Sequence, residues 1–368
     1  MKGTPFQKVL LMIVLAATAV ALILQFINSQ FKPQTEVEQV KPVMSMSQYT
    51  YTPHQPKAAM NAPEETEADE PAPPKVPREK AEAWLVKHNR NAASLLAVFR
   101  ALGDANYLNE AATNFPNNPQ VELAVLSRNA FPADRQKWLD LFKASSPSNS
   151  LANYLSAADC FKNGKSDVAM KELLAASGKG QFQDYGMETL LDAEELFSDS
   201  GTSAREVASY AMACWSEDNL PQLTSFKLVA QGVGEAMKQQ IAAGNAESAG
   251  NLAQLGLDFT GKINSGDSGK FLINQMVGTS AERIVLSQLD QNTAYDFLNG
   301  QTPAQIVDNL KQQKDEVRKL IQDFLPAQMQ MMTSESETAS YMQRLKIYGE
   351  VEAMKWVIQQ HPPGAAPK

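Results

Sequence analysis

The chain has 368 residues, of which 43% are hydrophobic and 20% charged, a composition typical of a globular protein and not of a disordered or collagen-like one. At roughly 150 residues per domain, this length allows one to three domains. The net charge of −8 argues against nucleic acid as a partner, because binding a phosphate backbone requires a basic surface.

Residues 1–32 contain a strongly hydrophobic segment, Val9–Ile27, in which Thr18 and Gln25 are the only strongly polar residues. At about 1.5 Å per residue it is long enough to span the hydrocarbon layer of a membrane, about 30 Å thick. A cleaved signal peptide is the alternative, but apolar residues continue past the small-residue cleavage sites, which favours an uncleaved signal anchor. More lysines precede the segment than follow it. This bias predicts a single-pass protein with residues 33–368 on the extracytoplasmic (periplasmic) side.

Residues 33–78 predict a disordered, acidic linker. Nine of the 20 prolines lie there, together with the acidic run Glu64–Glu70. Proline removes backbone donors and like charges repel one another, so this segment is not expected to build a core. The last residues, 361–368, hold three more prolines and predict a disordered tail.

From 79 to 360 the apolar residues recur at helical spacing, which predicts an all-α fold. Helices this short are stable only when they pack on neighbours. The expected segments of the first half are Trp84–Phe99 (closed by Gly103), Tyr107–Phe115, Val121–Leu126, Trp138–Phe142, Leu151–Phe161 and Val168–Ala176. Proline is tolerated in the first turn of a helix but not in its interior, so seven prolines are expected at helix boundaries: Pro116, Pro119, Pro132, Pro147, Pro221, Pro303 and Pro326.

The breaks in this first half recur after about 31 residues, a period that points to an α-solenoid of helical hairpins. Within 149–176, small, aromatic and turn residues stand at the positions Ala157, Cys160, Phe161, Gly164, Ala169, Leu173 and Ala176. In this pattern the segment resembles the tetratricopeptide repeat family, and weaker copies surround Gly103 and Gly244. The resemblance implies a TPR-like solenoid over 79–217, with a concave surface that binds a protein or peptide.

Residues 218–360 predict a C-terminal helical region with longer elements: Gln222–Ala243, Gly269–Leu289, Ala304–Phe324 and Glu335–Gln360. Thr302 and Pro303 form a typical helix start, with a capping side chain followed by proline. The amphipathic helix Ala304–Phe324 either packs within the chain or pairs with a second copy, and its short heptad pattern favours internal packing.

No catalytic, metal-binding or cofactor-binding motif occurs in the sequence, so we expect no cofactor and no metal. A histidine-based site would depend on His88, because the other two histidines lie in or beside proline-rich segments. Cys160 and Cys214 lack the spacing of a metal site and are expected as buried apolar residues or, in an oxidising compartment, as a disulfide. The carboxylates Asp192, Glu194 and Glu195 are expected on a solvated helix face, with an acid–base pair as the alternative.

These patterns together predict a non-enzymatic, membrane-anchored scaffold of the cell envelope that binds a protein or peptide partner. One alternative is a helical envelope enzyme of the hydrolase type that uses Glu194 and Glu195. The other is a structural envelope component that self-associates through 304–324.

Overall fold

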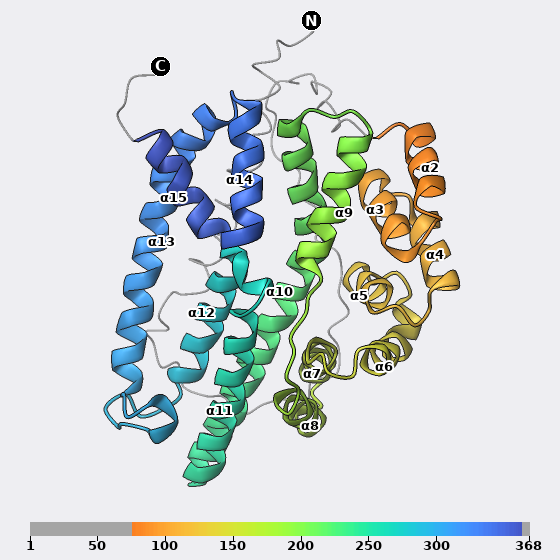
Figure 1. The fold of residues 1–368 in the computed structure, drawn as a ribbon. Coiled ribbons are helices and arrows are strands. Elements are labelled where there is room, and N and C mark those ends of the chain that lie inside the picture. Colours follow the sequence, from red (N-terminus) through yellow and green to blue (C-terminus); the bar gives the residue numbers. More distant parts are fainter. Residues whose placement is uncertain (1–75, 363–368) are drawn as a thin grey trace, which may run out of the picture. The chain divides into compact units, whose positions relative to one another are not determined.

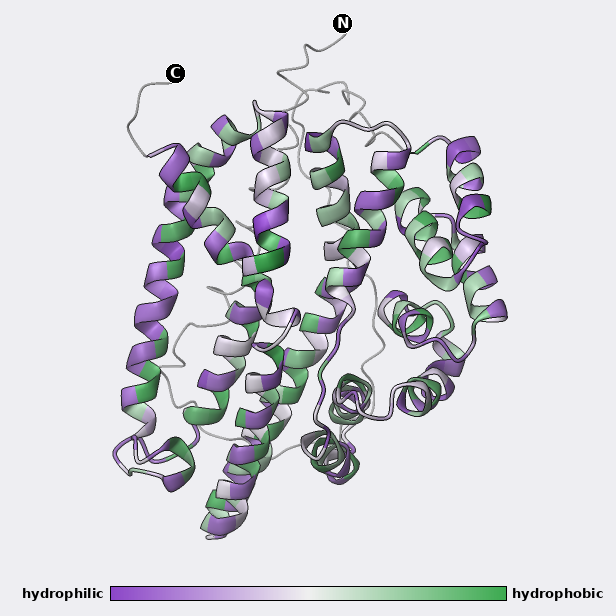
Figure 2. Cartoon of the chain, in the orientation of Figure 1, coloured by the Kyte–Doolittle hydropathy of each residue, from purple (hydrophilic) through white to green (hydrophobic). Residues whose placement is uncertain are grey.

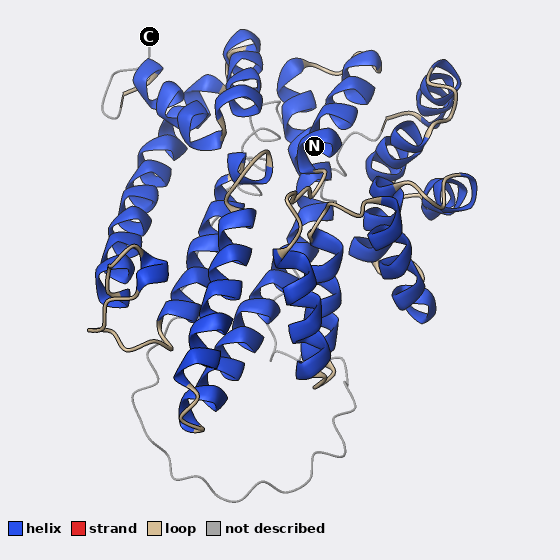
Figure 3. Cartoon of the chain, turned by 60° about the horizontal axis from the view of Figure 1, so that its bottom comes forward, coloured by secondary structure: helices blue, strands red, loops and turns tan. Residues whose placement is uncertain are grey.

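The computed structural model describes residues 76–362; the predicted membrane anchor, the linker up to residue 75 and the tail from 363 lie outside the described residues. Residues 76–362 are helical throughout and contain no β-strand, which confirms the predicted all-α class (Figure 3). Within this range, no helix combines the length and the hydrophobicity that crossing a bilayer requires.

Fourteen α-helices make up the described residues, and 3₁₀ turns occur at 132–134, 268–270 and 296–298. The α-helices are α2 (Arg78–Lys87), α3 (Ala92–Leu102), α4 (Ala105–Asn114), α5 (Pro119–Arg128), α6 (Arg135–Ser145), α7 (Leu151–Lys162), α8 (Ser166–Ser177), α9 (Gly186–Asp199), α10 (Ala204–Ala242), α11 (Ala246–Ile263), α12 (Leu272–Leu286), α13 (Pro303–Met331), α14 (Glu335–Tyr348) and α15 (Glu350–Gln360).

The helices of the first half pair in chain order, α3 with α4, α5 with α6 and α7 with α8. The first member of each pair, α3, α5 or α7, packs against α9 or α10 (Figure 1). Figure 2 shows hydrophobic and hydrophilic residues interspersed along these helices, as expected when one side of each is buried. The side of the pairs that α3, α5 and α7 form, called the inner face below, is therefore covered by α9 and α10 of the same chain.

Helix α10 is the longest element, and its capping box of Ser203 and Glu206 fixes its first turn. It runs unbroken through the boundary expected between 217 and 218, and the described residues 76–362 belong to one compact unit. Pro221 lies inside α10, so the prediction that it marks a helix boundary is wrong. Packing explains the continuity, since α10 contacts α9, α7, α11 and α12 along its length.

Aromatic rings join α10 to the helices on either side of it. The Phe259 ring of α11 lies 4.6 Å from that of Tyr154 on α7 and 5.7 Å, edge-on, from that of Phe226 on α10. All three side chains are at most 1% exposed. Tilted and edge-on rings at these separations add specific contacts to the burial of apolar area.

Local sequence signals set several helix ends. Asn118 caps α5 and Pro119 occupies its first turn, while Gly103 ends α3 with a φ of +65°. The predicted start at Thr302 is confirmed, because its side chain accepts the backbone N–H of Gln305 in a capping box. Five of the seven prolines lie at helix starts or in the connections, as predicted.

Three other expected elements differ from the structure. Trp84–Phe99 is two helices, α2 and α3, separated by a turn in which Asn89 and Arg90 have positive φ. Glu335–Gln360 breaks at Gly349, whose φ of +90° is a conformation that other residues rarely adopt. Pro326 lies within α13 and is not a boundary.

Helix α13 packs against α15 and α12, and α14 packs against α15 and α10. The buried residues of α13 include Leu310, Ile321 and Phe324, all on the predicted apolar side. This arrangement agrees with internal packing of that side of the helix.

The contact between α7 and α10 yields a stability prediction. A Cβ added at Gly232 of α10 would lie 2.5 Å from Cγ of Phe161, a distance that real Cβ atoms essentially never show. Gly232→Ala should therefore lower the free energy of unfolding by about 1–3 kcal/mol, the usual cost of overpacking. Urea unfolding followed by circular dichroism measures this change.

Gly261→Ala is the matched control, because Gly261 also lies in a helix but has nothing within 4 Å of the added Cβ. Because alanine has a better helix propensity than glycine, this substitution should leave the free energy of unfolding unchanged or raise it by up to about 1 kcal/mol. Equal effects of the two substitutions would contradict the close packing of α7 on α10.

Candidate functional site

One surface depression of the described residues is an open groove of about 390 Å³ where α3 and α5 begin. Its lining combines short apolar side chains, two aromatic rings and three amides, and none of its residues is charged. The lining residues are Asn91, Ala92, Ala93, Phe115, Asn118, Pro119, Gln120 and Tyr185. An uncharged groove with a few amides at its edges suits an extended peptide better than a charged metabolite.

Helix starts shape two walls of the groove. The Asn91 side chain accepts the Ser94 N–H at 2.8 Å, and the Asn118 side chain accepts those of Gln120 and Val121. The N-terminal end of a helix carries a partial positive charge, so both walls favour electron-rich groups such as peptide carbonyls.

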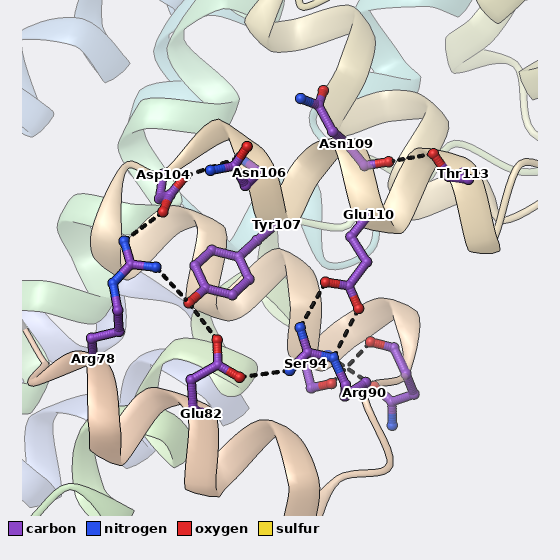
Figure 4. Close-up of polar contacts among 11 residues, drawn as sticks. Arg78, Glu82, Arg90, Ser94, Asp104, Asn106, Tyr107, Asn109, Glu110 and Thr113 are labelled. Atoms are coloured by element: carbon purple, nitrogen blue, oxygen red, sulfur yellow. Dashed lines mark hydrogen bonds and ion pairs between the residues drawn. The ribbon is translucent and has the colours of Figure 1, made fainter.

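A polar network holds the turn that leads into α3 (Figure 4). Arg90, whose φ is +44°, donates two hydrogen bonds to Glu110 of α4, at 2.8 and 2.6 Å, and one to Glu82 of α2 at 2.6 Å. Tyr107 donates to the other oxygen of Glu82 at 2.7 Å. The hydrogen bonds that Glu82 accepts from Tyr107 and Arg90 lower the pKa of its carboxyl group, and the bond from Tyr107 has the larger effect. The network thereby fixes the unusual backbone beside Asn91.

The third wall comes from the residues that precede α9. Tyr185 has a φ of +54°, and Asp184 accepts the Gly186 N–H at 3.0 Å and the Asn274 side-chain N–H at 3.2 Å. A Cβ on Gly186 would lie 2.7 Å from Nε1 of Trp215, so only glycine fits there. Burial raises the pKa of Asp184 above its usual range.

Behind the groove lies a buried ion network that connects three helices. Asp218 of α10 accepts from Arg100 of α3 at 2.6 Å and from Arg128 of α5 at 2.8 Å. The side chains of Asp218 and Arg100 are only 7% and 5% exposed, whereas Glu217, which also pairs with Arg128, is 56% exposed. Buried charges persist only when paired and hydrogen-bonded, so Asp218 fixes the distance of α3 and α5 from α10.

Glu122 of α5 is a second buried acid near the groove. Its side chain is fully buried, one oxygen accepts a hydrogen bond from Ser145, and the other has no hydrogen-bond partner. Burial raises the pKa of Glu122 to about 6, and the Ser145 bond opposes part of that rise.

The residues singled out for the repeat resemblance lie together in the hairpin of α7 and α8. Four of them are buried, with at most 2% exposure: Ala157, Ala169, Leu173 and Ala176. Cys160 and Phe161 are partly buried at the end of α7, and Gly164 forms the turn with a φ of +69°. A second hairpin, α10 with α11, turns at Gly244 with a φ of +75° and buries Ala249 and Ala253.

Asp192 and Glu194 of α9 are less solvated than expected, whereas Glu195 is 53% exposed, as expected. Glu194 is 15% exposed and pairs with Lys346 of α14 at 2.6 Å, and burial raises the pKa of Asp192. Glu195 lies 3.6 Å from Nε2 of His88, whose ring packs against Trp84. Glu194 therefore belongs to a contact between α9 and α14, and Glu195 lies beside His88 at the end of α2.

No group of histidine, cysteine and acidic residues within 76–362 is arranged to hold a metal ion. Cys160 and Cys214 are both free thiols in the structure. Burial raises the pKa of Cys214 to about 12, so this thiol stays protonated at neutral pH.

The groove and the ion network were not foreseen from the sequence. Asn91 and Asn118, each followed closely by apolar residues, are helix-start signals that mark two of its walls. No sequence signal connects Arg100 to Asp218, which lies 118 residues further along the chain.

Removing the shared carboxylate tests the ion network. Asp218→Ala leaves Arg100 buried without its partner, and the free energy of unfolding should fall by about 3–5 kcal/mol. Glu217→Ala, the control, removes an exposed partner of Arg128 and should cost at most about 1 kcal/mol. Chemical denaturation measures the free energy of unfolding of both variants. Similar losses of stability in the two would contradict a special importance of the buried pair of Asp218 and Arg100.

The raised pKa of Glu122 predicts a pH effect. In the folded protein the pKa of Glu122 is about 6, above the ordinary value of 4.5 that applies in the unfolded chain. The protonated Glu122 therefore contributes stability below pH 4.5, and this contribution is lost as the pH rises through about 6. Glu122→Gln removes this loss and should stabilise the protein by up to about 2 kcal/mol at pH 7.5, with less than half of that at pH 5. Unfolding curves of both proteins at the two pH values measure this gain in stability. A gain that does not depend on pH would contradict the raised pKa of Glu122.

Comparison with known proteins gives no match. No protein-family model matches the chain, and neither a curated protein nor a solved structure shows significant similarity to it. What is proposed of its function rests on the groove, on the polar contacts around it and on the sequence.

Proposed function

We propose that this chain is a non-enzymatic scaffold of the cell envelope, anchored in the membrane by residues 9–27, which binds a protein partner as an extended peptide segment. The location in the cell envelope follows from the predicted membrane anchor, the predicted linker and the predicted extracytoplasmic topology. The uncharged groove at the starts of α3 and α5 is the observation that carries the binding role.

The helical hairpins support a solenoid of the tetratricopeptide-repeat type. In the hairpins of α7 with α8 and α10 with α11, a glycine with positive φ makes the turn and small residues are buried in the second helix. Small residues allow paired helices to approach closely, which is how such arrays stack.

The position of the binding surface differs from the one that the resemblance implies. Helices α9 and α10 cover the inner face of α3, α5 and α7, so a partner cannot occupy a concave surface there. The groove lies instead at one end of α3 and α5, where Phe115 and Tyr185 offer aromatic contact. Aromatic residues of this kind contribute much of the binding energy at protein interfaces.

Both alternatives are less well supported by the contacts. The acids of an envelope enzyme would be Glu194 and Glu195, but Glu194 is engaged by Lys346. The apolar side of 304–324 buries Leu310, Ile321 and Phe324 within the chain, which leaves less of it for a second copy.

Site-specific photocrosslinking in intact cells tests the proposal. A photoreactive residue in place of Gln120, in the full chain, should give a discrete adduct with another protein, because Gln120 lines the groove. Adding Ala93→Trp fills the groove and should remove most of this adduct.

Asn109→Trp is the matched control, because Asn109 is exposed on α4 and is not among the groove residues. Equal adduct in the two tryptophan variants would contradict binding in the groove. An adduct that contains only a second copy of this chain would favour the self-associating alternative.

A further inference from the structure

A small polar chamber lies behind the groove and shares two walls with it, Gln120 and Tyr185. It holds a volume of about 10 Å³. Its remaining walls include Arg100, Ser127, Asp218 and Gln222, so it adjoins the ion network that holds α3 and α5 to α10.

Two side chains of the chamber carry polar atoms without a hydrogen-bond partner in the protein. Gln222 is 3% exposed; its Nε2 donates to the Asp218 backbone carbonyl at 3.2 Å, and its Oε1 has no partner. The amide cannot be turned around, because Oε1 would then face a carbonyl oxygen. Ser127 Oγ is also buried and without a partner.

We propose that the chamber binds one water molecule, which joins Gln222 of α10 to Ser127 of α5. The volume is about that of a single water, and two polar partners are what a buried water needs. An unsatisfied buried acceptor is costly, and a bridging water removes that cost at both atoms.

The charges around the chamber select a neutral occupant. The guanidinium group of Arg100 disfavours a cation, and the carboxyl groups of Asp218 and Asp184 together with Gln222 Oε1 disfavour an anion. The occupant must donate to Gln222 Oε1 and exchange a hydrogen bond with a hydroxyl, and water does both. The same water would connect the paired helices to α10 beside the Asp218 network.

A crystal structure of the full chain in detergent, at about 1.8 Å resolution, tests the proposal directly. The expected result is a density peak within about 2.7–3.2 Å of both Gln222 Oε1 and Ser127 Oγ. An empty chamber, or a Gln222 Oε1 bonded to another protein group, would overturn it.

A double-mutant cycle gives an independent test. Ser127→Ala should lower the thermal midpoint in the native background, and this shift should shrink by at least half when Gln222→Met has already removed the other anchor of the water. Ser177→Ala, on α8, bonds only to the Leu174 carbonyl and should shift the midpoint equally in both backgrounds. Equal shifts for Ser127→Ala in the two backgrounds would contradict a shared water.

Discussion

The carboxylate of Asp218 is the constraint on which the placement of α3 and α5 against α10 depends. It holds Arg100 of α3 and Arg128 of α5 at the same point of α10; the side chains of Asp218 and Arg100 are almost out of contact with solvent, whereas that of Arg128 is 25% exposed. Apolar packing tolerates small sliding movements between helices, whereas a hydrogen-bonded ion pair does so only at a high energetic cost. Asp218 therefore sets the register of α3 and α5 on α10.

Under the proposed function, that register also determines where a partner would bind. Because α9 and α10 cover α3, α5 and α7, the surface that helical repeats commonly offer is occupied by the chain itself. What stays open is the end of the array, where α3 and α5 begin and Tyr185 leads into α9. Arg90, bonded to Glu82 and Glu110, supports the backbone at this edge, so the proposed groove is shaped by contacts within the chain itself.

Much of the fold could be predicted where the signal is local. Caps such as Asn118 and Thr302, and a turn glycine such as Gly164, act within four residues, and the structure shows them in those roles. Pro221 and Pro326 fail as boundaries for the opposite reason. Each lies in a helix whose two ends pack on other elements, and that packing outweighs the local cost of an interior proline.

The sequence by itself determined that residues 76–362 are mostly helical and where helices such as α4, α5, α7 and α8 start and stop, because helical periodicity and capping are properties of neighbouring residues. Only the tertiary structure decided that α10 covers the paired helices, that Arg100 meets Asp218, and that the groove lies at the beginnings of α3 and α5. These features join residues separated by up to 118 positions in the chain. Such contacts depend on how the apolar faces of many helices fit together, which no local pattern encodes.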